Sequence, residues 1–139
     1  MAGSVFVDTS GWYALIDRRD ASHEAMTNEV QRLIRDGARL VSTDHVIDES
    51  CTLAKARAGS VAALRLLDLL DGTVALDVEW IGPEQFDRAK ALFRKYRDQA
   101  FSFTDCTSFA VMRERRLKEV VTTDDHFRFM GFQLLPAGS

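Results

Sequence analysis

Short apolar, β-prone runs alternate with helical segments along the whole chain, and this alternation restricts the fold more than any other feature. The first run, Val5-Phe6-Val7, is followed directly by Asp8-Thr9-Ser10, which predicts a buried strand that leads into a helix. The other runs predict strands over residues 40–42, 74–78, 120–122 and 133–135. Strands that alternate with helices are typical of an α/β domain with a mostly parallel sheet between helices.

Helix boundaries follow from capping residues, glycines and proline. Asp20 is expected to cap a helix that runs to Arg35, and Thr43 or Asp44 a helix that runs to about Ala58. Ser60 is expected to cap a third helix to Leu70, with Gly72 as its stop. Three more predicted helical segments begin at Pro83 and Thr104 and, as a short turn, near His126.

The composition fits one globular domain over residues 1–139, with 46% hydrophobic and 28% charged residues. It excludes disordered and collagen-like chains. The longest apolar run, residues 12–16, is too short for a membrane span or a signal peptide, so a cytoplasmic location is expected. Cys51 and Cys106 lack the spacing of a zinc site, and Cys106 is expected to be a core residue.

Four acidic residues stand at strand ends or near helix starts. Asp8 follows the first strand and Asp124 the fourth, whereas Glu49 and Asp105 fall near the starts of predicted helices. If the strands are parallel, the four carboxylates can converge at one edge of the sheet. Clustered carboxylates need a cation, and oxygen ligands suit Mg²⁺ or Mn²⁺. The chemistry indicated is metal-assisted hydrolysis of a phosphodiester.

In four segments the sequence resembles PIN-domain proteins, the ribonuclease family that includes VapC-type toxins. The matching segments lie in the family's order at residues 5–10, 43–49, 102–108 and 122–127. The resemblance implies a three-layer domain with a mostly parallel central sheet flanked by helices. It also implies a metal-dependent ribonuclease for single-stranded RNA, with Asp8, Glu49, Asp105 and Asp124 as catalytic and metal-binding residues and Ser10 in support.

Two of these assignments have an acidic neighbour as an alternative. Glu49 is preferred to Asp48 because it matches the family's helix acid, and adjacent helical side chains point about 100° apart. Asp124 is preferred to Asp125 because it stands first after the strand, with Asp125 kept as a supporting residue. His126 is expected to be a surface or half-buried turn residue.

Charge is distributed unevenly along the chain. Residues 88–118 carry nine basic and three acidic side chains, whereas residues 1–87 carry eight basic and fifteen acidic ones. A basic segment in an acidic protein favours contact with phosphates. The residues expected to contact RNA beside the acidic site are Arg94, Lys95, Arg97, Arg113, Arg115 and Arg116.

The resemblance further implies a protein partner, a small antitoxin. Its inhibitory segment is expected to fill a groove walled by the helices near Trp12 and Leu53 and to direct an arginine at the carboxylates. A homodimer is also implied. Two alternatives remain open: a catalytically silent PIN-like module that binds RNA or protein, and a housekeeping PIN nuclease that processes RNA.

Overall fold

The central feature of the fold is a five-stranded sheet in which every neighbouring pair of strands is parallel. The structure is a computed structural model that describes residues 3–138. The strands lie in the order β3-β2-β1-β4-β5, so the first strand is central. Their bounds are Ser4–Val7 (β1), Arg39–Thr43 (β2), Leu76–Glu79 (β3), Glu119–Val121 (β4) and Gln133–Leu135 (β5).

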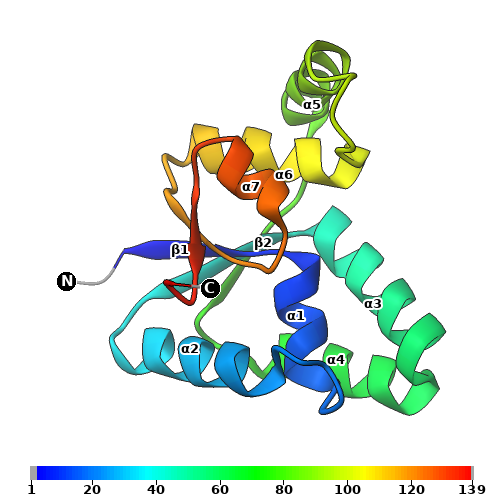
Figure 1. Ribbon diagram of the computed structural model, residues 1–139, viewed down its shortest axis with the longest axis vertical. Helices are drawn as coiled ribbons and strands as arrows, with labels where there is room; N and C mark the ends of the chain where they lie inside the picture. The colour runs from blue at the N-terminus through cyan, green and yellow to red at the C-terminus, as the bar shows by residue number, and fades with distance from the viewer. Residues whose placement is uncertain (1–2, 139) are drawn as a thin grey trace.

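Helices cover both faces of the sheet and make a three-layer arrangement (Figure 1). On one side lie α1 and α2, with α3 and α4 next to them, and on the other side lie α6 and α7. The helix α5 packs on the outside of α6. The helices are Thr9–Ile16 (α1), His23–Arg35 (α2), Asp44–Ala58 (α3), Ser60–Gly72 (α4), Pro83–Lys95 (α5), Phe103–Glu114 (α6) and Asp125–Phe129 (α7).

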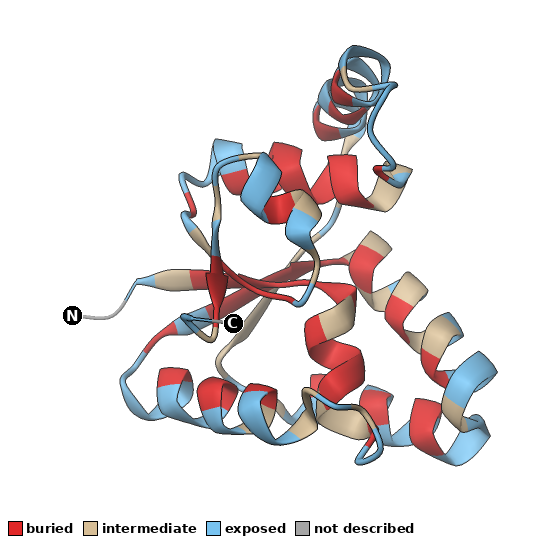
Figure 2. Ribbon diagram, viewed as in Figure 1, coloured by how far each residue is buried: buried red, intermediate tan, exposed pale blue. Residues whose placement is uncertain are grey.

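The core lies between these layers, along β1, β2 and β4 and the helices that face them (Figure 2). Helix α1 approaches β4 very closely, because a Cβ added at Gly11 would lie 2.6 Å from the carbonyl oxygen of Val121. Trp12 and Tyr13 are buried, and so is Cys106, for which the sequence predicted a place in the core. The close packing of α1 on β4 holds the ends of β1 and β4 side by side.

The alternation of strands and helices is confirmed, although several boundaries differ from those expected; α4, for example, includes Gly72, and β4 ends at Val121. The sixth helix is capped by Ser102 and not by Thr104, because Ser102 and Asp105 form a capping box. The second helix begins at His23, since Asp20 instead holds the preceding turn by accepting from the backbone N–H of Ser22. Strand β3 begins at Leu76, two residues after the predicted start.

The helices and the sheet can each be compared with what the sequence predicted. No helix within residues 3–138 is both long and apolar enough to cross a membrane. The mostly parallel sheet expected from the sequence is parallel in all four pairings. Because parallel strands end at the same edge, this topology brings the segments after β1 and β4 to one place.

Candidate functional site

Asp8 lies at the carboxyl end of the central strand, between β1 and α1. Asp8 is 3% exposed. It occupies the N-cap position of α1, but its carboxylate makes no capping hydrogen bond to the helix. The hydroxyl of Thr122 donates to Asp8 Oδ2 over 3.1 Å, whereas Asp8 Oδ1 is buried and has no hydrogen-bond partner. A buried carboxylate oxygen without a donor is costly, and a bound cation would compensate it.

Two hydroxyl groups connect Asp8 to the segment that carries Asp124. Ser10 Oγ lies 2.8 Å from Thr122 Oγ1 and accepts from the backbone N–H of Thr123 at 3.0 Å. The Thr122 hydroxyl also accepts from the backbone N–H of Asp124 at 3.0 Å. Ser10 and Thr122 therefore fix the start of α1 relative to the segment after β4, and with it the position of both acids.

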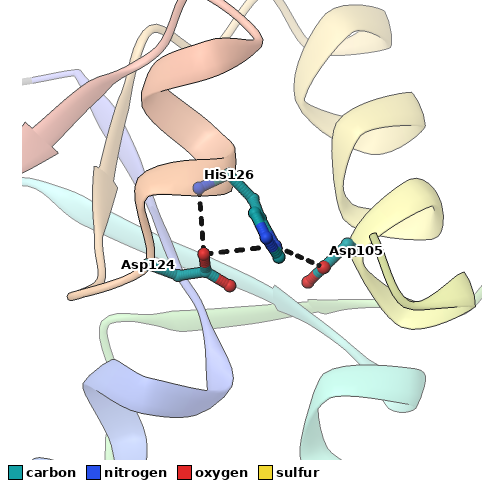
Figure 3. Close-up of side chains that lie close together, drawn as sticks. All are labelled: Asp105, Asp124 and His126. Carbon is teal, nitrogen blue, oxygen red and sulfur yellow. Dashed lines mark hydrogen bonds and ion pairs between the residues drawn. The ribbon is translucent and has the colours of Figure 1, made fainter. Parts of the chain in front are cut away.

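Asp105 and Asp124 stand at the starts of α6 and α7, and His126 lies between them (Figure 3). Asp105 Oδ2 accepts from the backbone N–H of Ser102, and Asp124 Oδ1 accepts from that of His126. His126 Nδ1 is 3.1 Å from Asp105 Oδ2 and 3.2 Å from Asp124 Oδ1. The imidazole thus joins two helix starts that are distant in the sequence.

Glu49 comes from the first half of α3 and is held by the start of α1. The hydroxyl of Thr9 donates to Glu49 Oε1 over 2.6 Å. The neighbouring Asp48 is exposed and lines a different cavity, which lies between α3, α4 and β3. Of the two adjacent acids, the structure places Glu49 with the other three.

A single cavity of about 250 Å³ brings the four predicted acids together. Four segments far apart in the sequence contribute to it, and Arg57 is the one basic side chain on its wall in the part of the chain that the structure describes. We refer to it as the acidic cavity. It is lined by Asp8, Thr9, Ser10, Tyr13, Asp20, Glu49, Leu53, Arg57, Asp105, Thr123 and Asp124.

Burial and mutual repulsion raise the pKa values of the two innermost acids. Burial is the main cause for Asp8, and the charges of Asp105 and Asp124 add to it. The nearby backbone N–H of Thr9, which attracts the carboxylate without forming a regular hydrogen bond, and the Thr122 hydroxyl oppose the increase. The result raises the pKa of Asp8 to about 7. The pKa of Asp105 is also raised, mainly by burial, although the Ser102 amide and His126 oppose this.

The donor set of this cavity suits a hard divalent cation. Carboxylate oxygens are the ligands that Mg²⁺ and Mn²⁺ prefer, and Asp8 offers a buried oxygen that no protein donor satisfies. Among the described residues, Asp105, Asp124 and His126 place ligand atoms within 4.8 Å of one another. Raised carboxylate pKa values are also expected where a cation is needed to neutralise neighbouring charges.

The structure adds residues that the sequence reasoning did not select. His126 is half-buried, as expected, but it contacts two of the acids instead of serving only as a turn residue. Thr9 and Thr122 hold two more of them. Arg57 could have been found, because Glu49, Leu53 and Arg57 follow one another at four-residue spacing, which places them along one face of α3.

Asp125 and the six basic residues lie elsewhere. Asp125 is exposed, pairs with Arg128 at 2.7 Å and lines a neighbouring cavity. None of the six basic residues lines the acidic cavity. Arg115 pairs with Glu79 at 2.9 Å, and Lys95 and Arg113 line a groove of about 450 Å³ between α5 and α6.

The basic residues come from both α5 and α6 and from the turns that follow them. Arg113 lies eight residues beyond Asp105 along α6, a distance of about 12 Å in an α-helix. Arg94, Lys95 and Arg97 lie instead at the end of α5, next to Tyr96, whose ring contacts Phe129 of α7. The six residues therefore do not form a group on the wall of the acidic cavity.

Comparisons with known proteins agree with this geometry. The sequence model of the PIN domain family matches residues 5–133. The chain is 33% identical over 129 residues to the 23S rRNA-specific endonuclease VapC20 of Mycobacterium tuberculosis, which covers 92% of this chain and 95% of the relative.

Two solved structures are similar as well. The crystal structure of M. tuberculosis VapC20, described as a sarcin-ricin loop cleaving toxin, matches with a TM-score of 0.81 and 29% identity over 92% of this chain and 95% of that one. FitAcB from Neisseria gonorrhoeae matches with a TM-score of 0.64 and 12% identity over 94% and 95% of the two chains. The second likeness supports the fold alone.

Proposed function

This chain belongs to the PIN domain family, and on that premise we propose that it is a divalent-metal-dependent endoribonuclease of the VapC type. The observation that carries the proposal is that Asp8, Glu49, Asp105 and Asp124 line one cavity although they come from four separate segments. We extend the proposal to one domain over residues 1–139.

In this proposal the four acids hold the cation, with Asp8 as the innermost ligand. Asp8 Oδ2 is fixed by Thr122, which leaves Oδ1 as the ligand oxygen. Glu49 is oriented by Thr9, and Asp105 and Asp124 are fixed by the backbone amides at two helix starts. Ligands that are held in this way need little rearrangement when the cation binds.

The cation, Mg²⁺ or Mn²⁺, would make an attacking water more acidic and stabilise the negative charge that develops on the phosphate. The protein's own contribution is positioning and charge balance. Arg57 is the cation of the cavity wall that can contact a phosphate of the substrate, and the Tyr13 ring lies 5.8 Å from its guanidinium carbon. RNA that enters an acidic cavity needs such a counter-charge.

The basic ends of α5 and α6 provide a second, longer-range contact for RNA in this proposal. Lys95 and Arg113 lie on the rim of the groove between these helices, together with Arg88, which is paired with Glu114. Arg94, Arg97 and Arg116 are exposed. We propose that these residues attract the phosphates of RNA over a distance and that Arg57 contacts RNA at the cavity.

The substrate we propose is ribosomal RNA, because the relative with 33% identity is a 23S rRNA-specific endonuclease. The similar structure with a TM-score of 0.81 carries the description of a sarcin-ricin loop cleaving toxin. Proteins mostly recognise RNA sequence in single-stranded loops, where a phosphodiester can enter a cavity such as this one. Work on ribosomal RNA would place the protein in the cytoplasm.

Two protein partners belong to the same proposal. A VapC-type toxin implies a small antitoxin, whose arginine would compete with the cation for the carboxylates. Leu53 lines the acidic cavity itself and can contact an apolar side chain of such a segment. A homodimer is proposed on the family resemblance. Expression of the chain alone should slow growth, and co-expression of the antitoxin should restore it.

The direct test is cleavage of a pool of cellular RNA by purified protein in Mg²⁺ or Mn²⁺, with the products mapped by sequencing. Wild-type protein should cut a small number of sites, and Asp8→Asn protein, shown by its thermal unfolding to be folded, should be slower by about 100-fold or more. No cleavage of any RNA would favour the silent PIN-like module. Cleavage that processes RNA precursors and leaves growth unchanged would favour a housekeeping nuclease.

A further inference from the structure

A second cavity adjoins the acidic cavity, and its wall chemistry points to a ligand of a different kind. It has a volume of about 360 Å³ and shares Thr123 with the acidic cavity. We refer to it as the side cavity. It is lined by Ser22, Ala25, Met26, Thr122, Thr123, Asp125, Arg128, Leu134 and Pro136.

The wall of the side cavity is mixed, with apolar side chains beside polar ones. Met26 of α2 and Leu134 of β5 are 2% and 7% exposed, and Pro136 follows β5 directly. Flat, apolar faces of a ligand can pack against such side chains, and stacking or packing of this kind is how proteins hold unpaired RNA bases. The volume of the side cavity is near the small end of the range for ligand pockets. A cavity of this size can hold one ring system but not a helix of a protein partner.

The polar groups on its wall include a hydrogen-bond acceptor, the Asp125 carboxylate, and a donor, the Arg128 guanidinium. Arg128 Nη1 donates to Asp125 Oδ1 over 2.7 Å, and the two side chains are 56% and 79% exposed. A phosphate would be attracted by Arg128 but repelled by Asp125. A neutral ligand that carries donors and acceptors on one edge, such as a nucleobase, matches the pair better.

From these observations we propose that the side cavity binds one nucleobase of the RNA next to the phosphodiester that is cut, with Asp125 and Arg128 reading its edge. The inference rests on the proposed function, because it deepens the substrate recognition of the same site. It gives Asp125 a role in specificity in place of a role in metal binding. The shared wall at Thr123 sets the base cavity beside the phosphate cavity.

The test uses short RNAs that contain a mapped cleavage site, with one abasic nucleotide moved along the sequence. For wild-type protein, kcat/KM should fall by about tenfold when one particular base beside the cut is removed. Asp125→Ala should lower kcat/KM on intact RNA by a similar factor. On RNA without that base, the variant and the wild-type protein should cut equally well. Ala25→Trp, which fills the side cavity from its exposed wall, should behave in the same way.

Two controls separate this role from general effects. Asp87→Asn breaks an exposed pair with Lys90 on α5, with the same three-residue spacing as Asp125 and Arg128, and should leave base preference unchanged. Mn²⁺ affinity, measured by calorimetry, should be unchanged in Asp125→Ala. A loss of Mn²⁺ affinity would overturn the proposal and return Asp125 to the metal site.

Other outcomes also decide the matter. Equal cleavage of intact and abasic RNAs by wild-type protein would overturn the inference while the proposed function stands. If no RNA is cut, the proposed function fails. Binding of a short single-stranded RNA, intact and with one abasic nucleotide at each position in turn, is then measured by fluorescence anisotropy. Tighter binding of intact RNA that disappears in Asp125→Ala would still support the base cavity, and equal binding would overturn it. Loss of antitoxin binding with unchanged base preference would assign the side cavity to a protein partner.

Discussion

The hydroxyl of Thr122 donates to Asp8 Oδ2 over 3.1 Å, across 114 positions of the sequence. This bond fixes the innermost acid of the cavity and leaves its other oxygen without a donor. The same hydroxyl accepts from the backbone N–H of Asp124. One side chain therefore orients two of the four acids.

Thr122→Val should weaken Mn²⁺ binding and slow RNA cleavage, each by about 10- to 100-fold, because residues that orient metal ligands have effects of this size. It should also lower the free energy of unfolding by about 1–3 kcal/mol, since a buried amide and a carboxylate lose a partner. The measurements are calorimetry with Mn²⁺, a cleavage assay and denaturant unfolding. The matched control is Thr27→Val, which removes a buried hydroxyl that has no hydrogen-bond partner. Wild-type metal affinity in Thr122→Val would contradict this role.

The stability of the metal-free protein should depend on pH through Asp8. Its pKa is about 7 in the folded protein against 3.8 for an unperturbed group, so the folded state holds this proton more tightly than the unfolded state does. The free energy of unfolding should therefore fall as the pH rises from about 4 to about 7, by an amount on the order of a few kcal/mol.

Asp8→Asn should remove most of this dependence and should be more stable than wild-type protein at pH 8 without metal. Saturating Mn²⁺ should stabilise the wild-type protein at pH 8 and have much less effect on the variant. Both comparisons are made by urea unfolding in EDTA and in Mn²⁺. The pH dependence of the Asp8→Asn protein gives the contribution of all other groups and is subtracted from that of the wild type. If the remaining free energy of unfolding rises between pH 4 and pH 7, the assigned burial of Asp8 is contradicted.

Two adjacent acids of α3 should behave differently. Glu49→Gln should reduce cleavage by about 100-fold or more, because Glu49 faces the acidic cavity and is oriented by Thr9. Asp48→Asn should retain cleavage within about twofold of wild type, since Asp48 is exposed on another face of the helix. Cleavage rates of the two purified variants on one RNA make the comparison. Equal losses would show that both acids take part.

Arg57 should contribute to RNA binding through charge. Arg57→Gln should raise the KM for RNA and reduce the slope of log affinity against log salt by about one, as expected for the loss of one phosphate contact. Lys55→Gln is the matched control, because Lys55 is also exposed on α3 but does not line the acidic cavity. An unchanged salt slope for Arg57→Gln would mean that this side chain does not contact phosphate.

His126 should influence which cation is preferred. Imidazole nitrogen is a better ligand for Mn²⁺ than for Mg²⁺, whereas carboxylates serve both. His126→Ala should therefore reduce Mn²⁺ affinity more than Mg²⁺ affinity. The two titrations are compared by calorimetry on the same variant. Equal changes for both ions would show that His126 acts only by holding Asp105 and Asp124 in place.

Much of the fold could be predicted from the sequence because the strands are short, apolar and separated by clear helix caps. Val5-Phe6-Val7 and its acidic successor are an example, and the structure has the strand over Ser4–Val7. The start of α6 could not be assigned with the same accuracy, because Ser102 and Thr104 both have capping side chains. The reciprocal bonds with Asp105 decide for Ser102.

The site was predictable where backbone topology alone brings residues together and unpredictable where side-chain direction decides. Asp8 and Asp124 converge because parallel strands end at one edge. The contacts of His126 with Asp105 depend on how α7 packs against α6, which no local pattern in the sequence specifies. For the same reason the basic residues of α5 and α6 could be counted in the sequence but not placed.

The central claim is that RNA cleavage depends on a divalent cation held by the four acids of one cavity. The most direct test is the cleavage rate of one RNA by EDTA-stripped wild-type protein as Mn²⁺ is added back, with Asp8→Asn protein measured in parallel. Cleavage should be absent without metal and rise to saturation with Mn²⁺ for the wild-type protein, while the variant stays at least about 100-fold slower at every concentration. Cleavage that persists undiminished in EDTA, or full activity of Asp8→Asn protein, would contradict the account.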